Sequence, residues 1–473
     1  MAWDLPELEA RQMYRLEFGV TVERDVVAAL GFRVRYEDAS RALQHQDFTV
    51  RIRFYREFQT YRPLGLNPYI AGPPIKTGEM FFGRHTALNW VVDHLIGKHG
   101  HNVLILYGER RTGKTSLLYQ IERLPNFADG TYIFALVDFQ DMSYWMNSTS
   151  QFYYGLAQRL TDKLVKQGVR ISAPSLEEFG AIPGPRFDQF VEAVIAALGQ
   201  RTLVILLDEF DLLLERFNRG DIDRAVEDHI RALFQHQTRL AFIFTGAHIV
   251  RAMIENPQTI LFNTAFRRQI GFLEPDDAYD LIRLPVAGQI EYDDLAVQRI
   301  LDATHGHPYF IQYICHYLFD RLKNERRNFA DMTDVTDAIR EVVQDAMGNI
   351  ANGYAQLRTE HKLILVTLAK ATLDSRRFVR TEEVFRRLEQ QYKIVLPERE
   401  RERWLTDLKQ RDFIETEQDR ERWLEGLKSR GHVDSDQAAR PDRIDFTMDL
   451  VRSWLINRAD RELRDLIDQW RAS

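Results

Sequence analysis

The sequence has little cysteine: Cys315 is the only one among 473 residues. A single thiol excludes an intrachain disulfide and a cysteine-based zinc site, and it is typical of a reducing compartment. The sequence also lacks a run of about 18 apolar residues, the length that a membrane span needs. The first ten residues carry Asp4, Glu7 and Glu9 instead of the basic-then-apolar order of a signal peptide. We therefore expect a cytoplasmic protein without membrane association.

Basic charge is not in excess, because the formal net charge is −7. This balance argues against a chain that is polybasic as a whole and leaves a local basic patch open. Repeats of about 20–50 residues, the mark of solenoid arrays, are absent too. What is present is ordinary for a globular protein, with 45% hydrophobic and 28% charged residues. The length corresponds to about three domains of roughly 150 residues.

Prolines and glycines gather in residues 63–80, after a small N-terminal piece, residues 1–62. At this density they break helices and strands, so we predict a linker or an ordered extended arm. In the N-terminal piece residues 21–30 are predicted to form a helix with Thr21 as its N-cap. Two strands are predicted there by alternating apolar residues, at residues 32–36 and 47–55. No chemistry is evident in this piece.

Short apolar runs alternate with helical stretches from residue 81 to about residue 273. The predicted strands are residues 102–107, 132–139, 203–207 and 240–245. The predicted helices between them are residues 115–123, 150–167 and 187–198. Alternation of this kind indicates an α/β fold, in which helices cover both faces of a parallel sheet.

The remainder is predicted to be all-helical over residues 274–353 and mixed over residues 354–473. In the second part three predicted helices precede two predicted strands: residues 360–371, 382–391 and 398–410, then 413–417 and 444–448. Three helices followed by a β-hairpin are typical of a winged helix. The sequence Arg-Glu-Arg-Trp-Leu at residues 401–405 recurs at 420–424. We interpret the recurrence as a tandem copy that lengthened the wing, with residues 428–443 as a loop.

The strongest motif is Gly-Glu-Arg-Arg-Thr-Gly-Lys-Thr at residues 108–115, between a predicted strand and a predicted helix. Its glycines let backbone amides turn towards phosphate oxygens, and the helix start adds partial positive charge. Lys114 is expected to reach the β- and γ-phosphates, and the Thr115 hydroxyl to ligate Mg²⁺. Further nucleotide contacts are predicted in the same segment for Gly108, Arg111, Thr112, Gly113 and Ser116.

A later apolar strand ends in two carboxylates, Asp208 and Glu209. Because open α/β sheets bind ligands at the carboxyl ends of their strands, Asp208 is predicted to hold Mg²⁺. Glu209 is predicted to orient or deprotonate the attacking water. The next strand ends in Thr245, which is interpreted either as a sensor of the γ-phosphate or as a strand-capping threonine.

Together, the phosphate loop, the Asp208–Glu209 strand and the attached winged helix resemble the AAA+ and STAND ATPases. Two further motifs resemble the STAND side, whose members are nucleotide-controlled switches. Residues 81–84, Phe-Phe-Gly-Arg, are similar to a motif near the adenine, although His85 stands where the family usually has Glu. Residues 306–308, Gly-His-Pro, are similar to the Gly-x-Pro of the STAND lid. The additional nucleotide-binding residues that the resemblance implies are Gly83, Arg84, His307 and Pro308.

The resemblance also bears on Arg267 and Arg268, which precede a predicted edge strand at residues 269–272. In AAA+ rings this position presents an arginine finger to the neighbour's γ-phosphate. The alternative is a solvated pair of arginines.

The implied fold is an α/β P-loop ATPase core over residues 81–273, a helical lid over 274–353 and a winged helix over 354–473. The implied function is an ATP-binding switch that hydrolyses ATP slowly with Mg²⁺ and couples the ATP or ADP state to a protein partner or to self-association. The alternative is a DNA-associated AAA+ ATPase (an initiator, loader or transposition regulator) that reads DNA with the winged helix. A third reading is an inactive scaffold stabilised by nucleotide. The candidate recognition helix, residues 398–411, carries nearly balanced charges, which favours the switch.

Overall fold

A computed structural model describes nine stretches of the chain, with these bounds: residues 26–37, 43–54, 61–96, 103–180, 182–247, 265–345, 347–374, 378–428 and 442–472. It divides into two compact units. The first consists of Met1–Pro63 with Arg326–Asn328, and the second of Leu64–Glu325 with Phe329–Ser473. No helix in the described stretches is long and apolar enough to cross a membrane.

The first unit contains an antiparallel pair of strands, β1 (Val26–Glu37) and β2 (Leu43–Phe54). The predicted helix over residues 21–30 is wrong in its described part, because residues 26–30 lie in β1. Pairing along 12 residues satisfies the backbone groups that face the partner strand, which outweighs a weak local helix preference. The two predicted strands are confirmed over their described residues.

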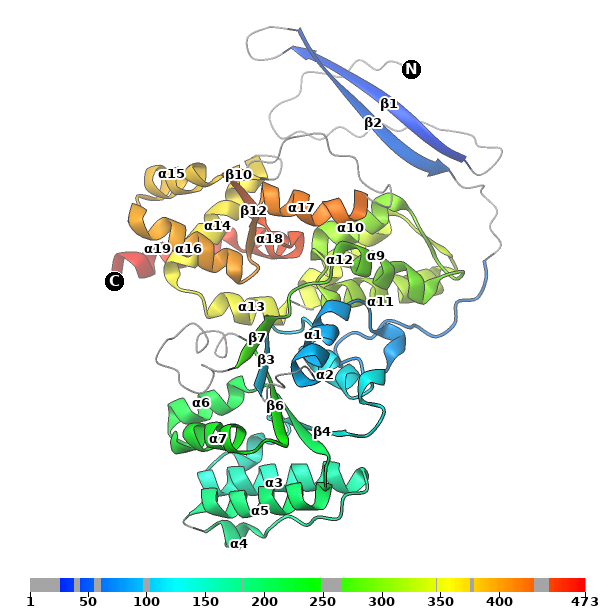
Figure 1. Cartoon of the computed structure of the whole chain (residues 1–473). Coiled ribbons are helices and arrows are strands. Elements are labelled where there is room, and N and C mark those ends of the chain that lie inside the picture. Colours follow the sequence, from blue (N-terminus) through cyan, green and yellow to red (C-terminus); the bar gives the residue numbers. More distant parts are fainter. Residues whose placement is uncertain are drawn as a thin grey trace. The chain divides into compact units, whose positions relative to one another are not determined.

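The second unit is built on a five-stranded parallel sheet in the order β4-β5-β6-β3-β7 (Figure 1). Its strands are β3 (Val103–Tyr107), β4 (Tyr132–Asp138), β5 (Thr202–Asp208), β6 (Leu240–Gly246) and β7 (Phe266–Gln269). Every residue of β6 is buried, as a strand covered on both faces requires. The predicted α/β class with a parallel sheet is confirmed.

Helices cover both faces of this sheet, and alternate strand residues serve the two cores. Leu206 belongs to the core under α1 (His85–Ile96) and α2 (Lys114–Ile121). Ile205 and Leu207 belong to the opposite core, which is completed by α3 (Thr149–Lys166), α5 (Pro183–Leu198), α6 (Asp211–Arg219) and α7 (Ala225–His236). Burial of each such side chain contributes about 1.5–3 kcal/mol to folding. These cores hold the strand ends in fixed positions.

Short elements connect these pieces. They are η1 (Gly78–Met80), η2 (Pro125–Phe127), η3 (Ser143–Trp145) and α4 (Leu176–Phe179). The helices predicted at residues 115–123, 150–167 and 187–198 correspond to α2, α3 and α5 and are confirmed within a few residues at their ends.

The segment after β7 is mostly helical: α9 (Pro275–Arg283), η4 (Leu284–Val286), α10 (Asp294–Thr304), α11 (Pro308–Glu325), α12 (Met332–Asp345) and α13 (Gly348–Ala355). The all-helical prediction is corrected by one parallel strand pair, β8 (Glu291–Tyr292) with β9 (Phe329–Ala330). Two residues are too few to show the period of a strand, so the pair was invisible in the sequence.

The C-terminal elements are α14 (Thr359–Asp374), β10 (Val379–Arg380), α15 (Thr381–Tyr392), α16 (Glu398–Gln410), β11 (Ile414–Thr416), α17 (Glu417–Lys428), β12 (Arg443–Phe446), α18 (Asp449–Ile456) and α19 (Ala459–Ala472). The three short strands form an antiparallel sheet in the order β10-β12-β11. The three helices and two strands predicted here are present. The sequence interpretation missed β10, and it missed that the second copy of the repeat forms the helix α17. The predicted loop at residues 428–443 lies mostly outside the described residues.

Candidate nucleotide-binding site

The phosphate loop lies between β3 and α2, in the strand–turn–helix setting that the motif requires. Gly113 has a φ of +95°, and a Cβ there would point into open space. Gly108 is needed for a different reason, since a Cβ on it would lie 2.2 Å from the carbonyl oxygen of Ile270. The loop therefore combines a left-handed turn with close backbone packing against the end of β7.

Lys114 is 6% exposed, and its Nζ donates hydrogen bonds to the carbonyls of Gly108 at 3.0 Å and Glu109 at 2.7 Å. Burial lowers the pKa of Lys114, and the carboxylates of Glu209 and Asp208 oppose that shift. A buried ammonium held by the carbonyls of its own loop suits the charge of a phosphate group.

Asp208 is buried at the carboxyl end of β5, beside Thr245 at the end of β6. Its Oδ1 accepts hydrogen bonds from the Thr245 hydroxyl and from the backbone N–H of Glu209. Its buried Oδ2 has no hydrogen-bond partner among the described residues. An orphaned carboxylate oxygen next to the phosphate loop fits a hydrated Mg²⁺, because the ion or its water would satisfy that oxygen.

Glu209 follows with a left-handed φ of +53°. Non-glycine residues adopt this conformation uncommonly, and such strain gathers at functional sites. Burial raises the pKa of Glu209, and the nearby Lys114 ammonium offsets part of that rise. A carboxylate whose pKa is raised accepts a proton more readily, which suits a general base.

A cavity of about 330 Å³ opens in front of these groups. This volume lies within the range of small-molecule pockets. The residues predicted to bind nucleotide that line it are Arg84, Arg111, Thr112, Gly113, Lys114, Thr115, Ser116 and Pro308, with the predicted base Glu209. Gly83, Gly108, Asp208, Thr245 and His307 are absent from its lining, as are Arg267 and Arg268.

One wall of the cavity comes from the Pro/Gly-rich segment, including Ile70, Pro73 and Pro74. Of the two alternatives that the sequence predicts for this segment, a linker or an ordered arm, the structure has the ordered arm. The backbone N–H of Ile70 donates to Gln312 of α11 at 2.8 Å, and that of Ile75 donates to the Ser116 hydroxyl of α2 at 2.9 Å. Sequence reasoning missed this wall, since an irregular segment has no period to reveal its contacts.

Arg84 connects the phosphate loop to the end of the core. Its guanidinium donates to the carbonyls of Thr112 at 2.9 Å, Gly271 at 2.7 Å and Phe272 at 3.2 Å. Burial lowers the pKa of Arg84 to about 10. The preceding Gly83 suits this turn, because its φ is +68° and a Cβ there would lie 2.9 Å from the Cβ of Asp277.

The lid motif divides between two cavities. Pro308 and Tyr309 line the cavity in front of Lys114, and the Arg111 guanidinium lies 4.1 Å from the centre of the Tyr309 ring. His307 instead lines a separate small cavity with Glu109. Burial lowers the pKa of His307 to about 3, so the ring is neutral at physiological pH and brings no cation to a phosphate.

Arg267 and Arg268 lie within β7 and not before the edge strand, so the strand predicted at residues 269–272 is corrected to Phe266–Gln269. Parallel pairing with β3 begins at Phe266, and an edge strand tolerates charged side chains. Arg267 is exposed, while the Arg268 guanidinium lies 5.9 Å from the centre of the Trp90 ring.

Comparison with known proteins gives the same fold. Residues 97–254, roughly a third of the chain, match the family model described as an AAA domain. The Walker-type ATPase of Pyrococcus abyssi is similar in structure, with a TM-score of 0.53 at 15% identity, over 81% of this chain and 98% of that one. The ORC2 protein of Aeropyrum pernix, in ADPNP–ADP complexes, is similar with a TM-score of 0.54 at 14% identity, over 86% of this chain and 97% of that one. No curated protein matches. Residues 97–254 thus match an AAA domain, and the second unit has the α/β fold of these solved structures.

Proposed function

We propose that this chain is a STAND-type switch that binds ATP and ADP with Mg²⁺, hydrolyses ATP slowly and changes its protein contacts with the nucleotide state. The observation that carries the proposal is the convergence of the buried Lys114 ammonium and the orphaned Asp208 oxygen beside a cavity that residues of α11 line. A cation buried against carbonyls, next to a carboxylate oxygen without a hydrogen-bond partner among the described residues, is costly unless a ligand uses both.

The proposed roles follow from these positions. Lys114 binds the β- and γ-phosphates, and backbone amides of the loop, including that of Gly113, bind phosphate oxygens. Thr115 and Asp208 would hold Mg²⁺, which neutralises phosphate charge when bound. Glu209 orients the attacking water and takes its proton. The nucleotide, including its nucleobase, lies against the cavity wall formed by the Pro/Gly-rich arm, Pro308 and Tyr309.

Switching is proposed to act through the lid. Pro308 and Tyr309 begin α11, so a γ-phosphate that rearranges the Arg111 and Tyr309 contact would move that helix. A ligand shifts a conformational equilibrium only by its difference in affinity for the two states. The lid contacts are where ATP and ADP would differ.

The alternative, a DNA-associated ATPase, receives less support from the proposed winged helix. Basic residues of its candidate recognition helix α16 are engaged by carboxylates: Arg403 lies 3.6 Å from Glu400, and Lys409 lies 2.6 Å from Asp419. Such pairs reduce the field that attracts a phosphate backbone. We therefore propose a winged helix that faces either protein or the nucleotide lid.

Calorimetric titration with ATP and with ADP, each with Mg²⁺, tests the proposal, and a phosphate-release assay tests hydrolysis. Micromolar or tighter binding with slow phosphate release is the expected result. Absence of nucleotide binding would contradict the whole proposal, and binding without turnover would favour the inactive scaffold.

A further inference from the structure

The core passes into the lid through residues 271–273, which we call the junction. Carbonyls of the junction accept hydrogen bonds from two distant side chains. Arg84 donates to Gly271 and Phe272, and the indole Nε1 of Trp423 donates to Leu273 at 3.4 Å. The junction is thus held by the core on one side and by the C-terminal helix α17 on the other.

The core side of this arrangement reaches the nucleotide site directly. The same guanidinium of Arg84 that binds the junction also binds the carbonyl of Thr112, two residues before Lys114. The planar guanidinium fork fixes its several acceptors in one geometry. A displacement of the junction therefore changes the support of the phosphate loop.

The C-terminal side depends on close packing around Gly306. The Trp423 indole stacks on His305 with ring centroids 4.4 Å apart. A Cβ on Gly306 would lie 2.5 Å from the Leu273 carbonyl oxygen and 3.3 Å from the indole, and Gly306 has a φ of +77°. The N–H of Leu273 donates to the Gly306 carbonyl at 2.8 Å. The indole therefore packs where Gly306 of the lid motif contacts Leu273 of the junction.

Helix α17 is anchored to the other C-terminal elements by buried and charged contacts. Arg420 is 3% exposed; it pairs with Glu415 of β11 and donates to the Thr447 carbonyl at 2.9 Å. Lys409 of α16 lies 2.6 Å from Asp419 of α17. These contacts fix α17 to the small C-terminal sheet and to α16, so α17 moves with both.

The two copies of the repeated Arg-Glu-Arg-Trp-Leu sequence have diverged in use. In the first copy the Arg401 guanidinium lies 4.8 Å from the centre of the Phe385 ring, and Trp404 is buried in α16, which packs on α14. In the second copy Arg420 and Trp423 belong to α17, and this helix packs on α9 of the lid. The first copy is internal to the C-terminal elements, whereas the second reaches out of them.

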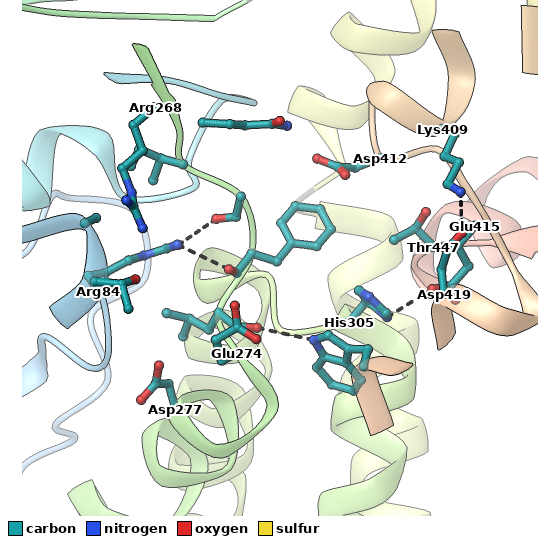
Figure 2. A pocket seen from close by; sticks show the side chains of 18 of the residues that line it. Arg84, Arg268, Glu274, Asp277, His305, Lys409, Asp412, Glu415, Asp419 and Thr447 are labelled. Carbon is teal, nitrogen blue, oxygen red and sulfur yellow. Dashed lines mark hydrogen bonds and ion pairs between the residues drawn. The ribbon is translucent and has the colours of Figure 1, made fainter. Parts of the chain in front are cut away.

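Other contacts also join the C-terminal elements to the lid: His305 lies 3.6 Å from Glu415 of β11, and Arg420 of α17 lies 3.8 Å from Asp302 of α10. A cavity of about 510 Å³ separates Arg84 and Arg268 on the core side from Lys409 and Asp419 on the C-terminal side (Figure 2). Among these contacts, the Trp423 indole is the one that reaches the Leu273 carbonyl of the junction.

We infer that Trp423 is a positioning residue for the nucleotide site: it holds the junction, and through Arg84 the phosphate loop, so that docking of α17 retains bound nucleotide. This inference rests on the proposed function. Undocking of α17 releases the junction and speeds nucleotide exchange, and nucleotide loss in turn weakens docking, because coupling between two sites is reciprocal.

Stopped-flow measurement of the release of a fluorescent ADP analogue from the full chain tests this inference. We expect Trp423→Ala to speed release about tenfold, within the usual range for coupled sites. Trp423→Phe keeps a ring over His305 and loses the N–H donor, so its effect should be intermediate. Trp404→Ala, the same change in the first copy, is the control, and it should lower the melting temperature without changing release from the folded protein.

A double variant separates positioning from general loosening. If Trp423 acts through Arg84, Arg84→Ala combined with Trp423→Ala should release ADP no faster than Arg84→Ala alone. Release at the parent rate in folded Trp423→Ala, or multiplied effects in the double variant, would overturn the inference and leave the proposed function intact. A parent chain that binds no ADP would overturn both.

Discussion

At the phosphate loop a lysine and an aspartate are buried with few partners for their charges. The Lys114 ammonium is buried against two carbonyls, and one oxygen of Asp208 is buried without a hydrogen bond in the described part of the chain. Opposite shifts accompany this arrangement, since burial lowers the pKa of Lys114 and raises that of Glu209. Perturbed groups of this kind gather at functional sites, where a bound ligand supplies the missing partner.

Removal of the Lys114 ammonium should abolish most nucleotide affinity. Hydrogen bonds to charged groups contribute about 1.5–3 kcal/mol, so Lys114→Ala should weaken ATP binding by about tenfold or more. Lys166→Ala changes an exposed lysine at the end of α3 and serves as the control. Calorimetry that found undiminished affinity in Lys114→Ala would refute the phosphate-loop role.

Glu209→Gln should keep nucleotide binding and lose hydrolysis, because the amide preserves shape and cannot take a proton. The expected fall in turnover is about 10²–10⁴-fold, whereas Glu177→Gln on the exposed α4 should leave turnover unchanged. The base works only when deprotonated. Since burial raises the pKa of Glu209 above the usual 4.5, turnover of the parent should increase with pH through that raised value. A pH profile that is the same in the parent and in Glu209→Gln would exclude this role.

Among the elements, the helices α16 and α17 show how the same five-residue sequence serves two purposes. Both contain Arg-Glu-Arg-Trp-Leu, yet Trp404 is buried within the C-terminal elements and Trp423 stacks on His305 at the junction. Helical propensity is the same for both copies, so packing partners alone separate their roles.

The charges of α16 predict weak DNA binding. Arg411 lies 3.1 Å from Asp407, as Lys409 does from Asp419 at 2.6 Å, and paired cations release few counterions from DNA. Fluorescence anisotropy with duplex DNA at low and at physiological salt, with and without ATP, should show no sub-micromolar binding at physiological salt. Binding that persists there and is lost when the exposed Arg399 and Arg403 are changed to Glu would instead support the DNA-associated alternative.

At the scale of the whole molecule, the arginines of the edge strand β7 bear on whether catalysis needs a second copy of the chain. Arg267 is exposed on β7, which is at the edge of the sheet, and neither it nor Arg268 lines the cavity in front of Lys114 of the same chain. An arginine at such an edge serves catalysis only through another copy. The predicted arginine finger therefore requires self-association of the chain.

A finger acting in trans predicts that turnover per chain increases with protein concentration. Arg267→Ala and Arg268→Ala should each be tested, and loss of the finger should lower turnover about 10³-fold or more at high concentration. Arg170→Ala, an exposed arginine elsewhere on the core, is the control. A flat concentration dependence, with mass measurement showing a monomer, would favour the solvated pair of arginines.

Features that depend on neighbouring residues can be predicted for this protein from the sequence alone. The phosphate loop is eight consecutive residues, and the strand ending in Asp208 and Glu209 is one apolar run. Three core helices, α2, α3 and α5, were predicted within a few residues, whereas α1, α6 and α7 were not. From these alone the α/β class, the sheet and the candidate base follow.

Tertiary structure decided what depends on pairing across the chain. Residues 26–30 form a strand because they pair with β2. The arginines of β7 lie in the sheet because β7 pairs with β3. The Pro/Gly-rich arm forms a wall of the cavity through its contacts with α2 and α11. The Trp423 indole of α17 contacts the junction at Leu273, 150 residues away in the chain. Such contacts leave no local pattern, because their energy comes from burial and hydrogen bonds between segments that the sequence separates.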